Sequence, residues 1–155
     1  MKDIPEKIQK HFEFLFQMGF KISDPISRGG LGNWILYIQS NKFNIKVLQD
    51  KNEIYLSLAA PRKSNKKISE LQFVSLDSVI GYFSKDLTYQ NLKNNSGDID
   101  AQMLKLANVL KSNYNNICLF FEKKKYTLIK EEFEVFLEAR RKHFLSPYGY
   151  KSKKK

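Results

Sequence analysis

The side chains that most often perform acid–base and nucleophilic chemistry are scarce in this chain. Histidine, the usual general acid or base near neutral pH, occurs only as His11 and His143, and the single cysteine is Cys118. His11 adjoins the apolar stripe of a predicted helix and His143 follows three cationic residues, so we expect both to be ordinary surface or boundary residues. Cys118 stands beside apolar residues at helical spacing and is expected to pack in the core as a small hydrophobic side chain.

Sites for metals and phosphates find little support. One thiol and two imidazoles cannot supply the ligands of a structural zinc site. The glycine-rich run over residues 28–33 has the composition of a phosphate-binding loop, but it lacks the Lys-Ser/Thr ending and precedes a predicted strand instead of a helix. A flexible loop fits it better. The functional alternative is a binding rim that presents Arg28 and Trp34 near the sheet edge, since arginine and aromatic side chains are favoured interface anchors; Trp34 also fits half-buried packing.

Carboxylates are the remaining candidates for catalysis. Four glutamates stand close together near the C-terminus: Glu131, Glu132, Glu134 and Glu138. Glu134 and Glu138 share one helix face, but Lys130, Arg141 and Lys142 can pair with them on a solvated surface. We therefore predict no catalytic residue, no cofactor and no metal, and a protein that is not an enzyme.

Length and composition favour one globular domain. A chain of 155 residues buries about two-thirds of the surface that its unfolded form exposes. The single cysteine, the absence of a secretion-signal pattern and the lack of an apolar run of about 18 residues predict a soluble cytoplasmic protein with no membrane segment. We predict a single α+β domain over residues 1–150 and a basic disordered tail over residues 151–155.

The chain is strongly basic, with a formal net charge of +11. Without the four lysines of the tail, 23 basic and 16 acidic residues remain, which is still +7. Such a balance favours an acidic protein, nucleic acid or anionic lipid as partner. Two clusters carry much of this charge: Arg62, Lys63, Lys66 and Lys67 in one loop, and Arg140, Arg141 and Lys142 at the end of the last predicted helix, close to Tyr148 and Tyr150.

The clearest structural signal is a hairpin with one dry face. On both sides of a turn at residues 50–52, apolar residues alternate with polar ones. Strands are predicted at about 33–40, 43–49 and 53–60, and their short connections require an antiparallel meander. Residues 71–74 could add a fourth short strand. Residues 20–32 contain Asp24-Pro25 and several glycines, which predict a loop.

Helical spacing of apolar residues predicts four helices. The first covers about residues 5–18 and ends before Gly19, and the second is capped by Ser75. A long amphipathic helix runs from a cap at Asp98 to about residue 121, and a last helix follows residues 123–125. Glutamates near the start of this last helix and cations near its end would complement the helix dipole. We therefore predict an α+β fold: an antiparallel meander of three to four strands covered by helices, with two C-terminal amphipathic helices.

This order of motifs resembles a group of known proteins. A helix carrying Phe14-Leu15 and Gly19-Phe20, then Gly32-Asn33-Trp34 entering a strand, then the turn at residues 50–52 is similar to small uncharacterised bacterial α+β proteins, some of them immunity- or defence-associated. The likeness covers residues 11–83. It implies a compact fold that binds and neutralises a partner, with no catalytic residue. A basic immunity-type protein implies an acidic face on its toxin, and inhibitors of nucleases are expected to be acidic, which argues against a nuclease target.

Three hypotheses follow. The leading one is a non-enzymatic binding protein, an immunity-like or defence-associated partner of another protein. Its predicted partner-binding residues are Arg28, Trp34, Arg62, Lys63, Lys66, Lys67, Arg140, Arg141 and Lys142. The alternative is a nucleic-acid-binding accessory protein that uses both basic clusters. A carboxylate enzyme, the third class, would require acidic residues from separate segments to converge in a pocket.

Overall fold

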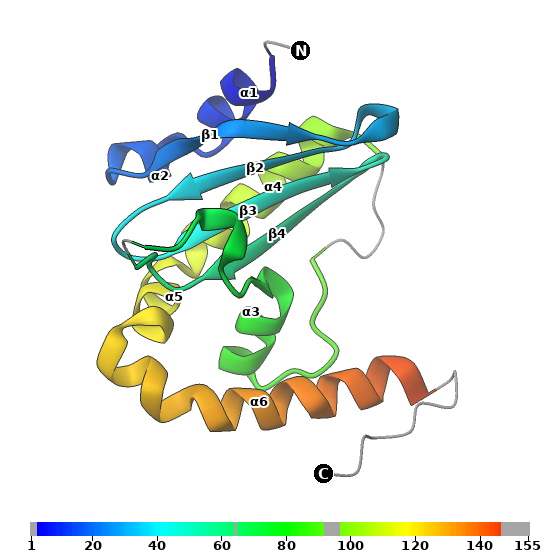
Figure 1. Ribbon diagram of the computed structural model, residues 1–155. Helices are drawn as coiled ribbons and strands as arrows, with labels where there is room; N and C mark the ends of the chain where they lie inside the picture. Colours follow the sequence, from blue (N-terminus) through cyan, green and yellow to red (C-terminus); the bar gives the residue numbers. More distant parts are fainter. Residues whose placement is uncertain (1–2, 64, 92–96, 147–155) are drawn as a thin grey trace.

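A computed structural model describes residues 3–63, 65–91 and 97–146, and its centre is an antiparallel sheet of five strands in the order β1-β2-β3-β4-β5 (Figure 1). The strands are β1 (Lys21–Arg28), β2 (Trp34–Gln39), β3 (Asn44–Asp50), β4 (Glu53–Ala59) and β5 (Val74–Ser75). The helices are α1 (Asp3–His11), α2 (Glu13–Gln17), α3 (Leu76–Ser84), α4 (Ile99–Ser112), α5 (Tyr114–Phe121) and α6 (Lys123–Leu145), with short 3-10 turns at Gly30–Gly32 and Ile68–Glu70. The predicted α+β class is confirmed; the predicted tail, residues 151–155, lies outside the described residues.

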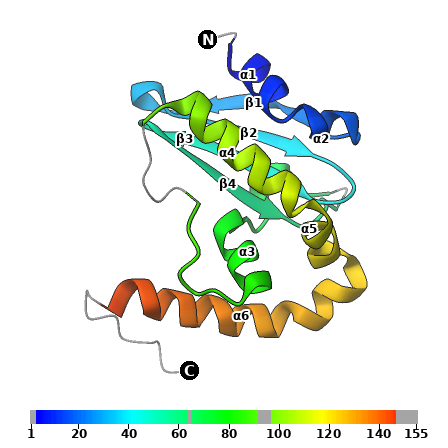
Figure 2. The ribbon, with the colours of Figure 1, turned by 180° about the vertical axis from the view of Figure 1, so that it is seen from behind.

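One face of the sheet is dry, as the alternation predicts. The buried side chains on it are Trp34, Leu36 and Ile38 of β2, Ile45 and Val47 of β3, and Ile54, Leu56 and Leu58 of β4. Figure 2 shows α4 lying across this face, with α1, α2 and α5 beside it. The three central strands are therefore paired as expected, and their alternate residues form the main core with these helices.

The first strand corrects the sequence prediction. Residues 21–28 were expected to form a loop, but they form β1, the edge strand beside β2. The pairing register shifts between Ser23 and Ser27, so the segment with Asp24-Pro25 is a bulge. Proline lacks a backbone N–H and is tolerated in a sheet at an edge or a bulge, and this strand supplies both. With β1 and the two-residue β5, the sheet has five strands, not three or four.

Two predicted helices are each divided. The helix expected over residues 5–18 leaves helical geometry at Phe12 (φ −108°, ψ 25°), which separates α1 from α2. The long helix expected up to residue 121 breaks at Asn113, whose side-chain amide donates to the carbonyl of Val109 (2.8 Å). Periodicity alone could not reveal these breaks because the apolar spacing continues through both of them. The second break allows α4 to follow the sheet while α5 turns towards α6 (Figure 2).

The predicted helix ends are largely confirmed. The hydroxyl of Ser75 accepts from the N–H of Ser78 (3.1 Å), and the carboxylate of Asp98 accepts from the N–H of Ala101 (3.2 Å). Gly19 follows α2 with φ +90°, a conformation that favours glycine. These caps begin α3 and α4 and let the chain turn from α2 into β1.

The start of α6 differs from the prediction. This helix begins at Lys123, so Lys123, Lys124 and Lys125 form its first turn and the glutamates lie in its middle. The expected match between glutamates and the N-terminal dipole is therefore wrong, because the lysines are part of the helix instead of preceding it. A cation in the first turn of a helix is unfavourable by about 0.3–1 kcal/mol at low ionic strength. Of the predicted cations Arg140, Arg141 and Lys142, Lys142 lies in the last turn of the helix.

The outer edge of β4 is closed by a side chain. β5 pairs only with Ser57 and Leu58, so the start of β4 has no strand beside it. The buried amide of Gln102, on α4, takes that place: its oxygen accepts from the N–H of Ile54 (2.9 Å) and its nitrogen donates to the carbonyl of Asn52 (2.7 Å). An unpaired strand edge is a hazard for aggregation, and this contact satisfies it from within the domain.

Replacing Gln102 by leucine should lower the free energy of unfolding by about 1–3 kcal/mol, because the buried N–H of Ile54 in β4 and the carbonyl of Asn52 in the preceding turn would lose their partner. Urea denaturation followed by circular dichroism measures this change. Lys105→Leu, at an exposed position of the same helix, is the control and should stay within about 0.5 kcal/mol of wild type. Equal stability of the two variants would contradict the role assigned to Gln102.

Candidate functional site

An apolar groove of about 690 Å³ lies between α3, α5 and α6. The apolar and aromatic residues that line it on these helices are Tyr82, Phe83, Leu119, Phe120, Leu128, Ile129, Val135, Phe136 and Ala139. Leu87, after α3, is a further apolar lining residue, and the polar ones are Lys85, Lys125 and Glu132. We call this feature the groove. Its walls come from two separate parts of the chain: α3 comes directly after β5 in the sequence, whereas α5 and α6 come after α4.

The groove exposes large apolar side chains to solvent. Leu128 is 80% exposed, Val135 is 71% exposed and Leu119 is 42% exposed. Single exposed leucines are common on protein surfaces, but a contiguous apolar surface with a polar rim is typical of an interaction site. Leu128 and Val135 are seven residues apart on α6, so they stand on the same side of the helix about 10 Å from each other along its axis.

The floor of the groove is a cluster of aromatic rings. The ring of Tyr82 packs edge-on against Phe120 (6.0 Å between centroids), Phe133 (5.5 Å) and Phe136 (5.8 Å). Gly81 allows this close approach: a Cβ there would lie 2.7 Å from the carbonyl oxygen of Asp86 and 3.2 Å from the ring of Phe136. The floor is therefore formed by closely packed rings that resist rearrangement.

The polar groups of the groove are partly engaged with each other. The hydroxyl of Tyr82 donates to the carboxylate of Glu132 (2.6 Å). Burial, together with this hydrogen bond, raises the pKa of Tyr82 to about 12. At neutral pH the phenol of Tyr82 is therefore protonated and can act as the donor of this hydrogen bond.

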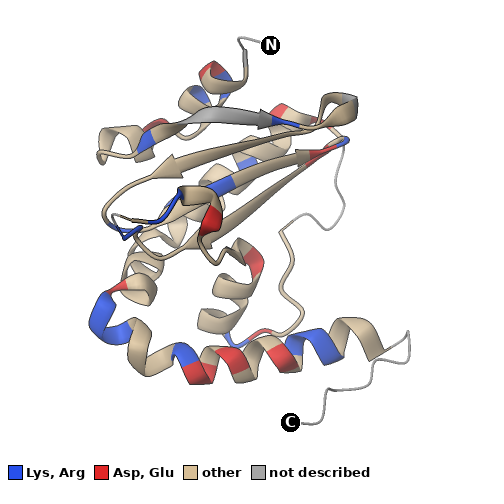
Figure 3. Cartoon of the chain, in the orientation of Figure 1, with Lys and Arg blue, Asp and Glu red and all other residues tan. Residues whose placement is uncertain are grey.

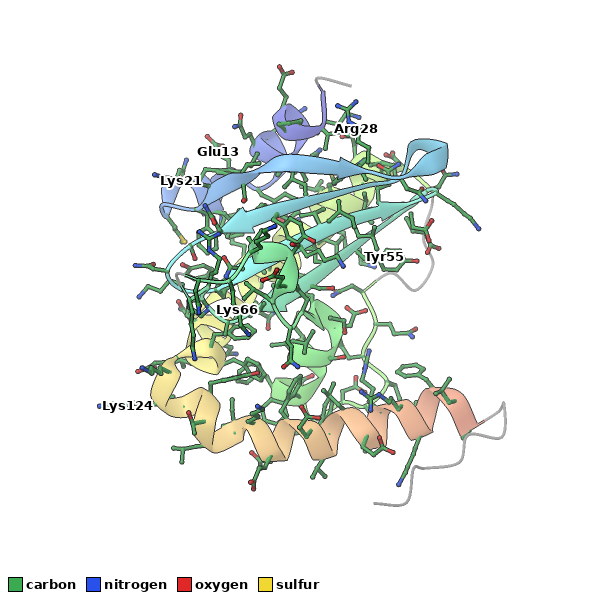
Figure 4. All side chains as sticks on the ribbon, viewed as in Figure 1. Glu13, Lys21, Arg28, Tyr55, Lys66 and Lys124 are labelled. Carbon is green, nitrogen blue, oxygen red and sulfur yellow. The ribbon has the colours of Figure 1, made fainter. Side chains whose placement is uncertain are left out.

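Cationic side chains border the groove. Lys125 lines it near the start of α6, where Lys123 and Lys124 are exposed beside it, and Lys85 lines it directly after α3. Figure 4 shows Lys124 extending outwards from the corner between α5 and α6. Lys125 is 4.0 Å from Glu122, an exposed pair that neutralises little of this charge.

Two residues predicted as partner-binding anchors have different surroundings. Arg28 is exposed at the end of β1 (Figure 4). Trp34 is only 4% exposed, and its indole N–H donates to the side-chain oxygen of Gln49 (2.9 Å). Of the two predictions for Trp34, packing inside the protein agrees with the structure better than an interface anchor. The reason is that the side chain of Trp34 projects from β2 to the face covered by helices. Its buried ring offers little surface to a partner.

The two basic clusters do not meet. The segment with Arg62, Lys63, Lys66 and Lys67 follows β4, whereas Arg140, Arg141 and Lys142 lie near the far end of α6. Figure 3 shows these two groups of blue residues at opposite sides of the molecule. The expectation that one nucleic-acid surface uses both clusters is therefore not supported by their arrangement, although Arg140 and Arg141 line a pocket with Phe73 and Val74.

Arg140 is a structural residue in this fold. It is 9% exposed, and its guanidinium donates to the carbonyls of Leu87 (2.9 Å) and Tyr89 (2.6 Å) and lies 4.9 Å from the ring centre of Phe144. Burial lowers its pKa, while the carboxylates of Asp77 and Asp86 act in the opposite direction. These bonds hold the segment after α3 against α6. Arg140 was predicted to bind a partner, but its guanidinium is buried and already engaged in these bonds. Arg141 and Lys142 are exposed.

The predicted acid–base candidates are dispersed. His11 is mostly buried and 2.9 Å from the carboxylate of Asp100, which also pairs with Lys7 (3.3 Å), so the three residues join α1 to α4. The hydrogen bond from His11 lowers the pKa of Asp100. His143 is exposed against the ring of Phe144. Neither histidine is among the residues that line the groove.

The thiol and the glutamates are likewise spread apart. Cys118 is partly buried against the core, as predicted. Glu138 pairs with Arg141 (3.4 Å) and Glu132 with Tyr82, so the four glutamates of α6 do not converge. Within residues 3–63, 65–91 and 97–146, no group of three or more His, Cys, Asp and Glu side chains could hold a metal ion. In the same ranges, no helix has the length and apolar character needed to cross a bilayer.

Sequence reasoning missed the groove. The apolar stripe of the last helix was read correctly, since Phe133 is buried and Ile129, Phe136 and Leu137 pack against the core. Leu128 and Val135 lie outside that stripe, and their spacing of seven residues was the available signal. Their importance depends on α3 and α5, which come from elsewhere in the chain.

Comparison of the chain with protein-family models, curated proteins and solved structures found no match.

Replacing Arg140 by methionine should lower the free energy of unfolding by about 2–3 kcal/mol, because the contact with Phe144 can persist while the donors to the two carbonyls are lost. The neighbouring Arg141→Met is the matched control. Its side chain is exposed and forms an ion pair with the partly exposed Glu138 (3.4 Å), so a change of about 0.5 kcal/mol or less is expected. Urea denaturation of both variants measures their free energies of unfolding. Similar losses of stability in the two variants would show that Arg140 has no special structural role.

Proposed function

We propose that this protein is a non-enzymatic binding protein, an immunity-like or defence-associated partner of another protein, and that the groove receives an amphipathic helix of that partner. The observation that supports this proposal is the exposure of Leu128 and Val135 above an aromatic floor. In the isolated protein these apolar side chains are in contact with water. Full burial of each one against a partner would contribute about 1.5–3 kcal/mol to the free energy of binding.

The shape and charge of the groove favour a helix as the occupant. A helix of two to three turns presents apolar residues at i, i+3, i+4 and i+7, and the distance between Leu128 and Val135 corresponds to that spacing. The lysines at the α6 end would attract acidic residues flanking the apolar stripe of this helix. The sequence resemblance to immunity-type proteins, which implied an acidic partner surface, points in the same direction.

Binding is favoured over catalysis by the chemistry of the lining. Of the 13 residues that line the groove, nine are apolar or aromatic residues of α3, α5 and α6. The hydroxyl of Tyr82 and the carboxylate of Glu132 are hydrogen-bonded to each other, which fixes their orientation. Such a lining excludes water and supplies contact area, the properties of a docking site.

The double variant Leu128→Asp/Val135→Asp should weaken partner binding at least about a hundredfold, because two apolar anchors worth more than 1 kcal/mol each would be replaced by charges that repel acidic residues. The partner is first isolated from the native host with tagged wild-type protein and then purified, and its dissociation constant is measured by calorimetry. The matched control is Met18→Asp/Leu104→Asp, which changes two exposed apolar side chains outside the groove.

Wild-type affinity in the control and loss in the groove variant would support the proposal. Equal affinity of the two double variants for the partner would place the interface elsewhere, and a host extract that yields no stoichiometric partner would contradict protein binding. An immunity-like role makes one further demand. Wild-type protein should inhibit an activity of the isolated partner, and the groove variant should not.

A further inference from the structure

A second surface lies at one end of the sheet and is formed by cations from several segments. The strands run antiparallel, so the start of β1, the turn between β2 and β3, and the chain leaving β4 all reach the same end (Figure 1). The cations at these places are Lys21, Lys42, Arg62, Lys63, Lys66 and Lys67, and we call this surface the basic end. Figure 4 shows Lys21 and Lys66 on the same side of the molecule.

The charges of the basic end are exposed and largely unopposed. All six side chains are exposed, and within the described part of the chain none of them is in an ion pair. Two carboxylates are nearby: Glu70, which accepts from the backbone N–H of Lys67 (3.2 Å), and Glu13, which Figure 4 places close to Lys21. Six cations facing two carboxylates leave this end strongly positive.

The opposite end of the sheet has no such excess of cations. Asp50 and Glu53 flank the turn between β3 and β4, but Lys51 lies in that turn and Arg28 ends β1 on the same side, and Figure 3 shows both red and blue at this tip. Asp50 accepts from the side-chain amide of Asn33 (3.1 Å). Positive charge is therefore concentrated at the basic end, which would attract a polyanion.

The dimensions of the basic end favour a linear polyanion. Its cations span the ends of four adjacent strands, which are about 4.8 Å apart, so the row is about 14 Å wide. One strand of a nucleic acid in helical form places a phosphate about every 3.4 Å along the axis, so about four phosphates match this width. A single small anion would engage only a fraction of the cations.

Aromatic rings adjoin the row of charge. Tyr37 and Lys46 are register partners on β2 and β3, and cross-strand partners project from the same face of a sheet. The ring of Tyr37 packs 5.7 Å from that of Phe73, and both rings are partly exposed. Rings next to cations are the arrangement on which unpaired bases stack.

We propose that the basic end binds the phosphate backbone of a nucleic acid, with the pair of Tyr37 and Phe73 available to an unpaired base. This surface is formed by the sheet and the segment after β4, so it does not depend on the function proposed for the groove. The basic end does not include Arg140, Arg141 and Lys142, although Arg140 and Arg141 line a pocket together with Phe73. It therefore differs from the surface that the sequence had predicted for nucleic acid.

The test measures fluorescence anisotropy of labelled 20-nucleotide single-stranded DNA and RNA, and of a DNA duplex, with the full chain between 50 and 200 mM salt. The variant Lys63→Gln/Lys66→Gln/Lys67→Gln should weaken binding at least about tenfold at 50 mM salt and reduce the slope of log affinity against log salt by about 2–3, because each lost phosphate contact removes about 0.7–0.9 from that slope.

The control variant Lys10→Gln/Lys105→Gln/Lys142→Gln removes the same charge from exposed positions of α1, α4 and α6. It should keep the wild-type salt slope, and the lysines of residues 151–155 are common to all three proteins. Equal weakening of both variants would assign binding to net charge alone and overturn the proposal. Absence of binding to all three oligonucleotides, or binding to phosphatidylserine vesicles without binding to nucleic acid, would overturn it as well.

Discussion

The contact between α4 and the dry face of the meander holds the remaining elements in their places. Leu106 and Leu110 of α4 are buried in the same core as Val47 and Leu56 of the sheet. Because α4 lies across the strands, Gln102 reaches the free edge of β4 and supplies the partners that a further strand would have given. One helix thus covers the core and closes the sheet.

This constraint also explains why α6 has an unoccupied apolar side. After α4 the chain turns at Asn113, and α5 leads away from the sheet to the corner where α6 begins. There α6 packs against α3 and α5, below the sheet in the view of Figure 1. Phe133 faces this contact and is buried, whereas Leu128 and Val135 face solvent. The groove is a consequence of a long helix that has neighbours on one side.

Polar contacts determine where α6 lies against its neighbours. Arg140 binds two carbonyls of the segment after α3, and in the same region the buried Asn91 donates to Asp77 (2.5 Å from its side-chain nitrogen). Burial raises the pKa of Asp77, with the hydrogen bonds from Asn91 acting against that shift. Apolar packing between aromatic rings tolerates sliding, whereas hydrogen bonds to particular carbonyls do not, so this network defines the position of the groove walls.

Local patterns in the sequence determined the elements whose signal is contained in a few residues. The period of two over residues 33–58 predicted the strands β2, β3 and β4, and for β3 and β4 the apolar residues that the structure buries. Ser75, Asp98 and Gly19 marked helix ends because capping depends on neighbouring backbone groups. The same local reasoning failed for β1, where pairing with β2 outweighed the preference of Asp24-Pro25 for a loop. It also missed the break at Asn113, since apolar periodicity continues through a bend.

The candidate sites depended on which segments meet. Sequence alone showed that Arg140, Arg141 and Lys142 are adjacent, but only packing buried the first and left the other two exposed. In the sequence, Lys21, Lys42 and the cluster at residues 62–67 are separate features. They lie at one end of the sheet because of the directions in which the strands run. Leu128 became part of a groove only when α3 and α5 came beside it. Composition and local spacing determine charge and element type, whereas a binding surface is made by residues far apart in the chain, whose proximity follows from tertiary packing.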